Sequence, residues 1–377
     1  MRKNSFYCQL HIMKLSLFKL YLHTIIIGNK VRKIYFYTKK RKEYLPFEDE
    51  EANTKAKQIL ENIRENLNLP TYIINDWDNV YLCSTGTIVE KAKSLYIKSL
   101  ESTFDLKNTL NDLTAKEWLT ETVTVFAQKG LGASNKDAQI EKLHPAPYSF
   151  QDVARLIRFY SKEGSHVLDP FGGVGSTAKA CAYENRRCTS IELNPKYHEL
   201  SIERILKEVP DDYLFKNKQT FLNGDSSKLI KTLPNDSFDF IVTSPPYWNI
   251  LETIDHKSKE RLESNLDTKY SDSDDDMANI EDYNDFLDKL CGMFDECHKI
   301  LKKGKYMCIV VSDFRKKDRF HLFHADIAYK LENLGHFRLK GVRILHQRHK
   351  SIYPYGYPFT FVPNIHHQNV LIFENIK

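Results

Sequence analysis

Short apolar runs separated by amphipathic stretches fill the chain between residues 149 and 243. Each run is too short for a helix and too apolar for a loop, so it predicts a buried strand. Four such strands are expected, at 167–168, 188–191, near 221 and at 238–242. The stretches between them have helical spacing and predict helices that begin near Ser149, Ser176 and Pro195. This alternation predicts an α/β fold with a doubly wound, mostly parallel sheet.

The C-terminal part continues the alternation of helices and strands and ends in a strand of the opposite direction. Apolar residues from Tyr283 to Leu301 recur at helical spacing and predict a long amphipathic helix that Gly304 closes. The remaining expected elements are a strand at 307–311, a helix at 325–334 and strands near 342–345 and 370–373. The order of these elements predicts that the final strand is antiparallel to the rest of the sheet.

Two sequences have the form of a capping box, in which a hydroxyl residue and an acidic residue three positions later close a helix start. Thr114-Ala-Lys-Glu117 predicts a helix through Trp118, and Ser149-Phe-Gln-Asp152 predicts a second helix that Gly164 ends. The second helix places four apolar side chains on one face, namely Val153, Leu156, Ile157 and Tyr160.

Charge divides the chain into parts. Residues 1–42 hold 11 Lys and Arg and no Asp or Glu; because the whole chain has a formal charge of +5, the remainder carries −6. This head is expected to be a disordered or poorly packed extension, with a phosphate-binding arm as the alternative. The acidic segment 251–279 predicts a solvated loop insertion. We therefore expect a basic extension at 1–42, an N-terminal region at 43–110 that supplies target recognition, and a main domain at 111–377.

Cysteine spacing and hydropathy argue against a metal-binding protein and against a membrane-spanning protein. The seven cysteines lack CxxC spacing, so they predict reduced thiols in a cytoplasmic protein and no metal site. The apolar stretch 15–27 is interrupted by Lys19 and His23, and no run reaches the length of a membrane span.

A glycine-rich turn follows the first strand of the main domain. It reads Asp169-Pro170-Phe171-Gly172-Gly173-Val174-Gly175 and leads into the helix that begins at Ser176. Glycines at such a turn permit positive φ angles and let a ligand approach the backbone closely. By itself the turn could also serve a dinucleotide or be a generic tight turn. It lacks the Gly-Lys-Ser/Thr of a phosphate loop, which disfavours ATP.

Three carboxylates lie at the ends of successive predicted strands. Asp169 precedes the turn, where it can meet the cationic methionine end of S-adenosylmethionine (AdoMet) but would repel the pyrophosphate of NAD. Glu192 has the spacing of an acidic residue that binds ribose hydroxyls, a feature shared with NAD enzymes. Asp225 is placed to accept from the adenine amino group. Together the three favour AdoMet as the cofactor.

The strand at 238–242 ends in Thr243-Ser244-Pro245-Pro246-Tyr247-Trp248. Ser244 to Tyr247 resembles the catalytic motif of the DNA amino-methyltransferases, and Asp169 to Thr177 resembles their AdoMet motif. His144-Pro145-Ala-Pro-Tyr148 is similar to the segment that helps to shape the methionine pocket in these enzymes. The resemblance covers roughly 111–373 and implies a Rossmann-like, AdoMet-dependent catalytic domain without a metal.

The resemblance also implies roles at the Pro-Pro corner. In this family the serine hydroxyl, here Ser244, and the carbonyl of the first proline, here Pro245, accept hydrogen bonds from the exocyclic amino group of the target base. Pro246 helps to fix the backbone, and Tyr247 stacks on a base flipped out of double-stranded DNA. Trp248 either adds to this stacking surface around the flipped base or is a core residue. Serine at the first position favours N4 of cytosine over N6 of adenine, and a cognate restriction endonuclease is an implied partner.

Two basic clusters are candidate DNA contacts: Arg315, Lys316, Lys317 and Arg319, and Lys340, Arg343, Arg348 and Lys350, which precede the aromatic segment 353–357. Basic groups beside aromatic rings suit phosphate contact and base stacking, although solvated charged faces have the same composition. Other interpretations are N6-adenine methylation, methylation of RNA or of a protein glutamine, a non-catalytic nucleic-acid-binding protein, and an NAD-dependent oxidoreductase.

Overall fold

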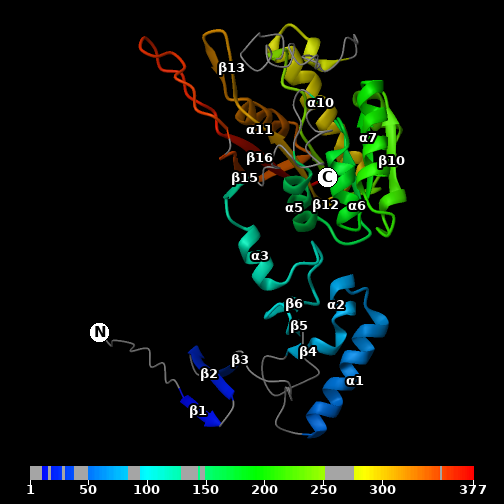
Figure 1. Cartoon of the computed structure of the whole chain (residues 1–377), viewed down its shortest axis with the longest axis vertical. Coiled ribbons are helices and arrows are strands. Elements are labelled where there is room, and N and C mark those ends of the chain that lie inside the picture. The colour runs from blue at the N-terminus through cyan, green and yellow to red at the C-terminus, as the bar shows by residue number, and fades with distance from the viewer. Residues whose placement is uncertain are drawn as a thin grey trace. The chain divides into compact units, whose positions relative to one another are not determined.

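The computed structural model describes the backbone of residues 11–15, 18–27, 30–37, 50–83, 94–128, 143–144, 149–250, 276–348 and 350–377. The chain divides into two compact units, Met1–Leu119 and Thr120–Lys377 (Figure 1). The division falls close to the start of the main domain expected at residue 111. The roles expected for 1–42 and 43–110 remain predictions.

The first unit contains two three-stranded antiparallel sheets and its own small core. Fully buried Ile73, Leu95 and Ile97 belong to that core. The capping box at Thr114 is confirmed, because the Thr114 N–H donates to Glu117 Oε2 at 2.9 Å and starts α3. The elements of this unit are β1 (His11–Leu15), β2 (Phe18–Ile27), β3 (Lys30–Tyr37), α1 (Glu50–Asn66), α2 (Thr71–Asn75), β4 (Val80–Cys83), β5 (Ser94–Ile97), β6 (Ser102–Asp105) and most of α3 (Ala115–Glu121).

The second unit is built on an eight-stranded sheet in the order β10-β9-β8-β11-β12-β16-β15-β7. Strands β10 to β12 are parallel, and β16 is antiparallel to both of its neighbours, as predicted. The strands are β7 (Val125–Ala127), β8 (His166–Asp169), β9 (Arg187–Glu192), β10 (Gln219–Asn223), β11 (Phe238–Thr243), β12 (Leu301–Val311), β15 (Phe337–His346) and β16 (His367–Asn375); a separate hairpin contains β13 (Phe314–Lys316) and β14 (Arg319–His321).

Helices cover both faces of this sheet (Figure 1). The ring of Phe240 in β11 stacks on Tyr160, with ring centroids 5.4 Å apart, whereas the next residue, Ile241, belongs to a core cluster with Phe286 and Leu290. Successive side chains of a strand point to opposite faces, so the helices that carry these partners, α5 and α10, cover opposite faces. The helices are α5 (Phe150–Tyr160), α6 (Ser176–Tyr183), α7 (Pro195–Glu208), α8 (Ser226–Leu229), α10 (Tyr283–Ile300) and α11 (Phe323–Asn333). The doubly wound, Rossmann-like fold is therefore confirmed.

Two predicted helix ends are wrong. Helix α5 ends at Tyr160 and is followed by an extended residue, so Gly164 belongs to the turn before β8. Helix α10 ends at Ile300, and Gly304 lies inside β12 at an irregularity, where Phe238 pairs with Leu301 but Phe240 pairs with Tyr306. Both glycines have positive φ angles, which occur in turns and bulges as well as at helix ends. Among the described residues no helix combines the length and apolar character needed to cross a membrane.

Candidate active site

The glycine turn after β8 is close-packed against the neighbouring elements. A Cβ atom at Gly172 would lie 1.9 Å from Ser190 Oγ, and one at Gly175 would lie 3.0 Å from Ser201 Cβ. Gly173 and Gly175 have φ angles of +51° and +79°. Glycine is required here because the backbone both bends into the left-handed region and touches its neighbours.

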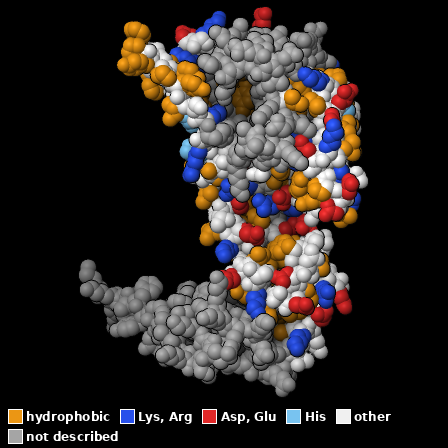
Figure 2. Space-filling model, viewed as in Figure 1, with side chains coloured by type: hydrophobic (Ala, Val, Ile, Leu, Met, Phe, Trp, Pro, Cys, Tyr) orange, Lys and Arg blue, Asp and Glu red, His pale blue; other side chains and the backbone are white. Residues whose placement is uncertain are grey.

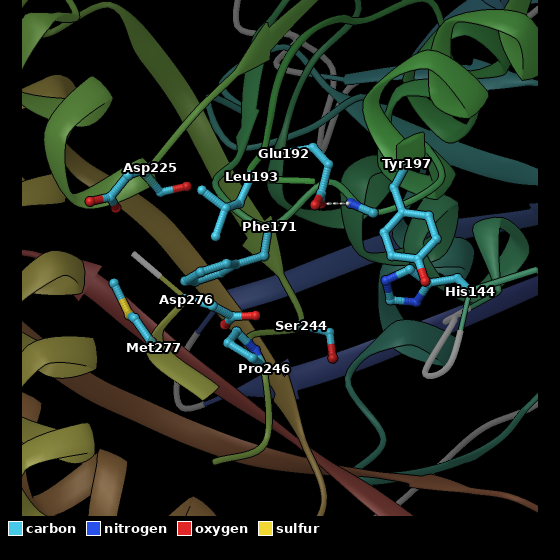
Figure 3. A pocket seen from close by; sticks show the side chains of 12 residues that line it. His144, Phe171, Glu192, Leu193, Tyr197, Asp225, Ser244, Pro246, Asp276 and Met277 are labelled. Atoms are coloured by element: carbon cyan, nitrogen blue, oxygen red, sulfur yellow. Dashed lines mark hydrogen bonds between the residues drawn. The ribbon is translucent and has the colours of Figure 1, made fainter. Parts of the chain in front are cut away.

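A cavity of about 600 Å³, including its open mouth, lies at these strand ends (Figure 3). In Figure 3 Asp225 lies at one end, His144 and Tyr197 lie at the other, and Glu192 lies between them. Ser244 and Pro246 line a further side together with Asp276 and Met277. The lining residues are His144, Phe171, Gly173, Glu192, Leu193, Tyr197, Asp225, Ser226, Ser244, Pro246, Asp276 and Met277.

Seven of the predicted site residues therefore meet at one cavity: His144, Phe171, Gly173, Glu192, Asp225, Ser244 and Pro246. Five others are not among the lining residues: Asp169, Pro170, Gly175, Pro245 and Tyr247. Pro145 lies outside the described residues.

Glu192 connects the glycine turn to the cavity. Its Oε2 accepts from the Gly173 N–H at 2.8 Å, and its Oε1 accepts from the Asn194 N–H at 2.8 Å. Burial raises the pKa of Glu192 to about 7, nearby Asp169 and Asp276 add to the rise, and the two backbone hydrogen bonds oppose it. A carboxylate held in this way still has lone pairs for a ligand hydroxyl or a positive charge.

Asp225 and Asp169 hold local structure. Asp225 begins α8, and its Oδ1 accepts from the Ser227 N–H at 2.8 Å. Asp169 is fully buried, and its carboxylate accepts from the Thr243 hydroxyl at 2.6 Å and from the Phe171 N–H at 3.0 Å. Asp169 thus ties the glycine turn to the start of the Pro-Pro corner and is not one of the residues that line the cavity. This placement does not support direct contact of Asp169 with the methionine end, for which it was predicted.

Asp276 and Met277 were missed because they fall in the segment expected to be a solvated loop. The end of that segment, from Asp276 to Ala278, is instead buried. Oδ1 of Asp276 accepts from the Ala278 N–H at 2.9 Å, while Oδ2 is buried and has no hydrogen-bond partner among the residues that the structure describes. Burial raises the pKa of Asp276, although the Ala278 N–H opposes the rise. An unpartnered carboxylate oxygen at a cavity wall is a ready acceptor for a ligand.

The Pro-Pro corner reaches the cavity through Ser244 and Pro246, and Tyr247 follows them without being one of the lining residues. The Tyr247 hydroxyl accepts from the Ser312 N–H at 3.1 Å and from Gln368 Nε2 at 3.3 Å. Burial raises the pKa of Tyr247, and hydrogen bonds with Gln368, Ser244 and the Ser312 backbone oppose the rise. The ring also packs against Phe323, with centroids 5.8 Å apart. These contacts fix the direction of the corner.

Trp248 is a core residue. Its side chain is buried, and its indole Nε1 donates to the Ile280 carbonyl at 2.8 Å. The ring packs against Tyr283, and Lys316 Nζ lies 3.8 Å from the ring centroid. The core alternative for Trp248 therefore fits the structure better than a place in the wall around a flipped base.

His144 and Tyr197 form the opposite end of the cavity. Their rings meet edge to face with centroids 4.7 Å apart, and a Cβ atom at Gly173 would lie 3.4 Å from His144 Nε2. Tyr197 was missed because its position on α7 follows the helical apolar pattern and carries no separate signal.

The residues of the two basic clusters differ in accessibility. Arg343 is buried, lies 4.4 Å from the Phe126 ring centroid and donates to the Val123 carbonyl, so its prediction as a DNA contact is wrong. Lys340 pairs with Glu374 at 3.1 Å. By contrast, the side chains of Lys317, Arg319 and Arg348 are exposed.

Among the described residues, one group of side chains has potential metal ligands close together. Ligand atoms of Asp295, His298 and His336 lie within 4.8 Å of one another. The two imidazole rings are stacked with centroids 3.8 Å apart and an angle of 6° between their planes, so their in-plane lone pairs lie in two nearly parallel planes and do not converge on one ion. This geometry gives no support for a metal site there.

The charge of the cavity distinguishes between cofactor classes. Its lining residues include three carboxylates, those of Glu192, Asp225 and Asp276, and no Lys or Arg among the residues that the structure describes. Such a lining attracts a sulfonium and an ammonium group and repels a pyrophosphate. The glycine turn and acidic lining at the carboxyl ends of a parallel sheet are the arrangement of a nucleoside-binding α/β enzyme.

Comparison with known proteins identifies the family. A family model described as DNA methylase, of the N6/N4 type, matches residues 5–203 and 238–373. The chain therefore belongs to the N6/N4 DNA methylase family.

Individual relatives match over shorter stretches. The Type II methyltransferase M.Cfr9I of Citrobacter freundii is 35% identical over 65 residues, which cover 17% of this chain and 22% of the relative. The Type II methyltransferase M.HinfI of Haemophilus influenzae is 30% identical over 139 residues, 37% of this chain and 33% of the relative. The chain thus spans between about a fifth and a third of the length of these relatives.

Two solved structures that match this chain share less than a fifth of their aligned residues with it. A SAM-dependent methyltransferase from Methanosarcina mazei is 16% identical, with a TM-score of 0.39, and the match covers 59% of this chain and 97% of that one. TYW2 of M. jannaschii in complex with AdoMet is 17% identical, with a TM-score of 0.33, and the match covers 65% and 80%. Scores this low carry no functional argument, so the fold assignment rests on the sheet itself.

Proposed function

We propose that this chain is a site-specific DNA methyltransferase that transfers a methyl group from AdoMet to the exocyclic N4 of cytosine. The observation that carries the proposal is the single cavity in which the acidic residues of the glycine-turn side, Glu192 and Asp225, meet Ser244 and Pro246 of the Pro-Pro corner. Family membership supports the reaction class.

The cavity can hold AdoMet along its length. We assign the adenine to the end at Asp225, the ribose hydroxyls to Glu192, and the methionine end to the region of Gly173, His144 and Tyr197. When bound, AdoMet supplies an electrophilic methyl group on a positively charged sulfur. Asp276 adds negative charge beside Pro246 and supports the binding of that cation.

The Pro-Pro corner would prepare the amino group of the target base. Its lone pair is delocalised into the base ring, which makes the nitrogen a poor nucleophile. The Ser244 hydroxyl and the Pro245 carbonyl would each accept a hydrogen bond from one N–H of the amino group. Because both acceptors are preorganised, these hydrogen bonds would favour a more tetrahedral nitrogen. With AdoMet bound, the nitrogen lone pair that Ser244 and Pro245 localise would take up the methyl group, the sulfur would keep the electrons of the broken carbon–sulfur bond, and the nitrogen would lose a proton to water.

Access to the amino group requires the base to leave the DNA helix, because the duplex hides it. The Tyr247 ring is held by Phe323 and by hydrogen bonds to its hydroxyl, so it would offer a fixed surface for stacking on the flipped base. We further propose a cytoplasmic enzyme of a restriction-modification system with a cognate endonuclease. The buried free thiols of Cys181, Cys188 and Cys308 are compatible with reducing conditions.

N6-adenine methylation is the nearest alternative, since the choice of cytosine depends on serine at position 244. A non-catalytic nucleic-acid-binding protein is the alternative from another class. Incubation with tritiated AdoMet and DNA from a methylation-deficient host, followed by separation of the labelled nucleosides, distinguishes these possibilities. Label in DNA supports an active methyltransferase, and a bound but unreactive DNA supports the non-catalytic alternative.

A further inference from the structure

A loop between β15 and β16 carries an unusual number of exposed aromatic side chains. Tyr357, Phe359 and Phe361 are 81%, 92% and 84% exposed, and Ile352 and Tyr355 are also exposed. We call residues 350–366 the aromatic loop. It projects from the sheet at the upper left of Figure 1, and Figure 2 shows hydrophobic side chains gathered at its outer end. Exposed apolar groups that cluster in this way mark an interaction site.

The aromatic loop has a defined internal structure. Asn364 clamps the two sides of the loop, since its Oδ1 accepts from the Tyr353 N–H at 2.9 Å and its Nδ2 donates to the Tyr353 carbonyl at 2.8 Å. The Phe359 and Thr360 N–H groups both donate to the Gly356 carbonyl at 2.8 Å. A Cβ atom at Gly356 would lie 2.3 Å from the Thr360 carbonyl oxygen, so the turn requires glycine. The rings are thus presented on a preformed tip, which lowers the entropy cost of binding.

The charge of the loop suits an anionic partner. Residues 347–366 contain Arg348 and Lys350 and no Asp or Glu. Arg348 is exposed at the base of the loop. The body of the protein is acidic beyond residue 42, so a basic and aromatic projection is a local exception. Positive charge next to exposed rings is the combination that binds the phosphate backbone and stacks on bases.

The base of the loop is connected to the Pro-Pro corner. Gln347 and Gln368, which flank the loop, lie within 3.5 Å of each other through Nε2 and Oε1. Gln368 Nε2 in turn donates to the Tyr247 hydroxyl at 3.3 Å. The aromatic loop therefore begins and ends beside the residues that hold the proposed base-stacking tyrosine.

We infer that the aromatic loop binds double-stranded DNA next to the target site and stacks its rings on bases exposed when the target base flips out. Flipping leaves a gap in the base stack, and an inserted apolar side chain offsets the lost stacking. Tyr357, Phe359 and Phe361 supply the rings. Arg348 and Lys350 supply positive charge for the DNA phosphates next to the stacked bases. This inference rests on the proposed function, because it identifies the DNA partner of the same site.

The test compares the wild type with the triple variant Tyr357→Ser/Phe359→Ser/Phe361→Ser. The matched control is Leu206→Ser/Leu214→Ser, which removes two exposed apolar side chains near the opposite, β10 edge of the sheet. Binding to short fluorescent duplexes of random sequence is measured by anisotropy, AdoMet binding by calorimetry, and the KM for DNA by tritium transfer. We expect the triple variant to weaken DNA binding by about tenfold or more. AdoMet affinity and thermal stability should match those of the control.

Unchanged DNA affinity and KM in the triple variant would overturn the inference. It is also overturned if the triple variant loses only self-association, measured by light scattering, or only binding to anionic vesicles, since the loop would then serve a second copy or a membrane. If the wild type transfers no methyl group to DNA yet its DNA binding depends on the three rings, the proposed function fails while the DNA contact stands.

Discussion

The backbone N–H of Gly173 donates a hydrogen bond to Oε2 of Glu192 over 2.8 Å. This contact joins the glycine turn after β8 to the acidic residue that ends β9. The turn and the carboxylate therefore have fixed positions relative to each other at one wall of the cavity. The pKa of Glu192, raised by burial to about 7, makes this wall sensitive to pH.

AdoMet affinity should depend on pH through Glu192. Ribose hydroxyls and the cationic sulfur favour the ionised carboxylate, so binding should strengthen as pH rises to about 7 and then level off. Below that pH the affinity should fall by up to about tenfold per unit. Calorimetry across pH 5.5 to 8.5 measures it, at roughly half-unit steps. The Glu192→Gln variant should bind more weakly above pH 7 and lose the pH dependence; an unchanged profile would contradict the role of Glu192.

The same carboxyl group should affect stability in the absence of cofactor. Its pKa in the folded protein lies above its ordinary value of 4.5, so the folded state holds the proton more tightly. The contribution of Glu192 is fully present below pH 4.5 and is lost as pH rises through about 7. The free energy of unfolding in urea should therefore depend on pH differently in the wild type and in Glu192→Gln between pH 4.5 and about 7. Parallel curves would show that Glu192 has an ordinary pKa.

Asp276→Asn should weaken AdoMet binding by about tenfold without loss of stability. The amide oxygen can still accept from the Ala278 N–H, whereas the negative charge at the unpartnered Oδ2 is lost. Calorimetry measures the affinity, and thermal unfolding provides the control. Wild-type affinity in this variant would exclude Asp276 from the cofactor site.

Gly172→Ala should destabilise the protein by about 1–3 kcal/mol, because the new Cβ atom overlaps Ser190 Oγ. Gly292→Ala is the matched control, since nothing lies within 4 Å of its Cβ position on the exposed side of α10. That substitution should stabilise the helix by up to about 1 kcal/mol. Urea unfolding measures both variants. Equal stability of the two would mean that the turn is not close-packed.

The sequence predicted the fold well where a short apolar run or a capping box determines an element. The runs at 167–168 and 238–242 became adjacent central strands, and Thr114 and Ser149 begin the expected helices. Gly164 and Gly304 were wrongly predicted to end helices, because a positive φ angle occurs in turns and bulges as well as at helix ends.

The site was predictable only where a residue belongs to a local motif. Glu192 ends β9, and Asp225 and Ser244 follow β10 and β11 of the same parallel sheet, so chain topology brings the three together. Asp276 reaches the cavity from a segment whose composition resembles a solvated loop, and Tyr197 occupies an ordinary helical position. Their roles depend on tertiary packing, which no local pattern records.

Ser244→Ala tests the proposed acceptor of the target amino group. The rate of methyl transfer should fall by about a hundredfold, because one preorganised acceptor is lost, while AdoMet affinity stays unchanged. Ser237→Ala, at a serine whose hydroxyl donates to the Pro234 carbonyl away from the cavity, is the control. Equal rates of methyl transfer in the two variants would show that Ser244 is not the acceptor of the target amino group.

The central claim is tested most directly by nucleoside mass spectrometry of DNA from cells that express the chain, with the Ser244→Ala variant alongside. The account predicts N4-methylcytosine in the DNA of wild-type expressing cells and a much smaller amount with the variant. N6-methyladenine in its place would contradict the assignment of the base. The absence of any new methylated nucleoside, with the folded protein present in the cells, would contradict the proposed function itself.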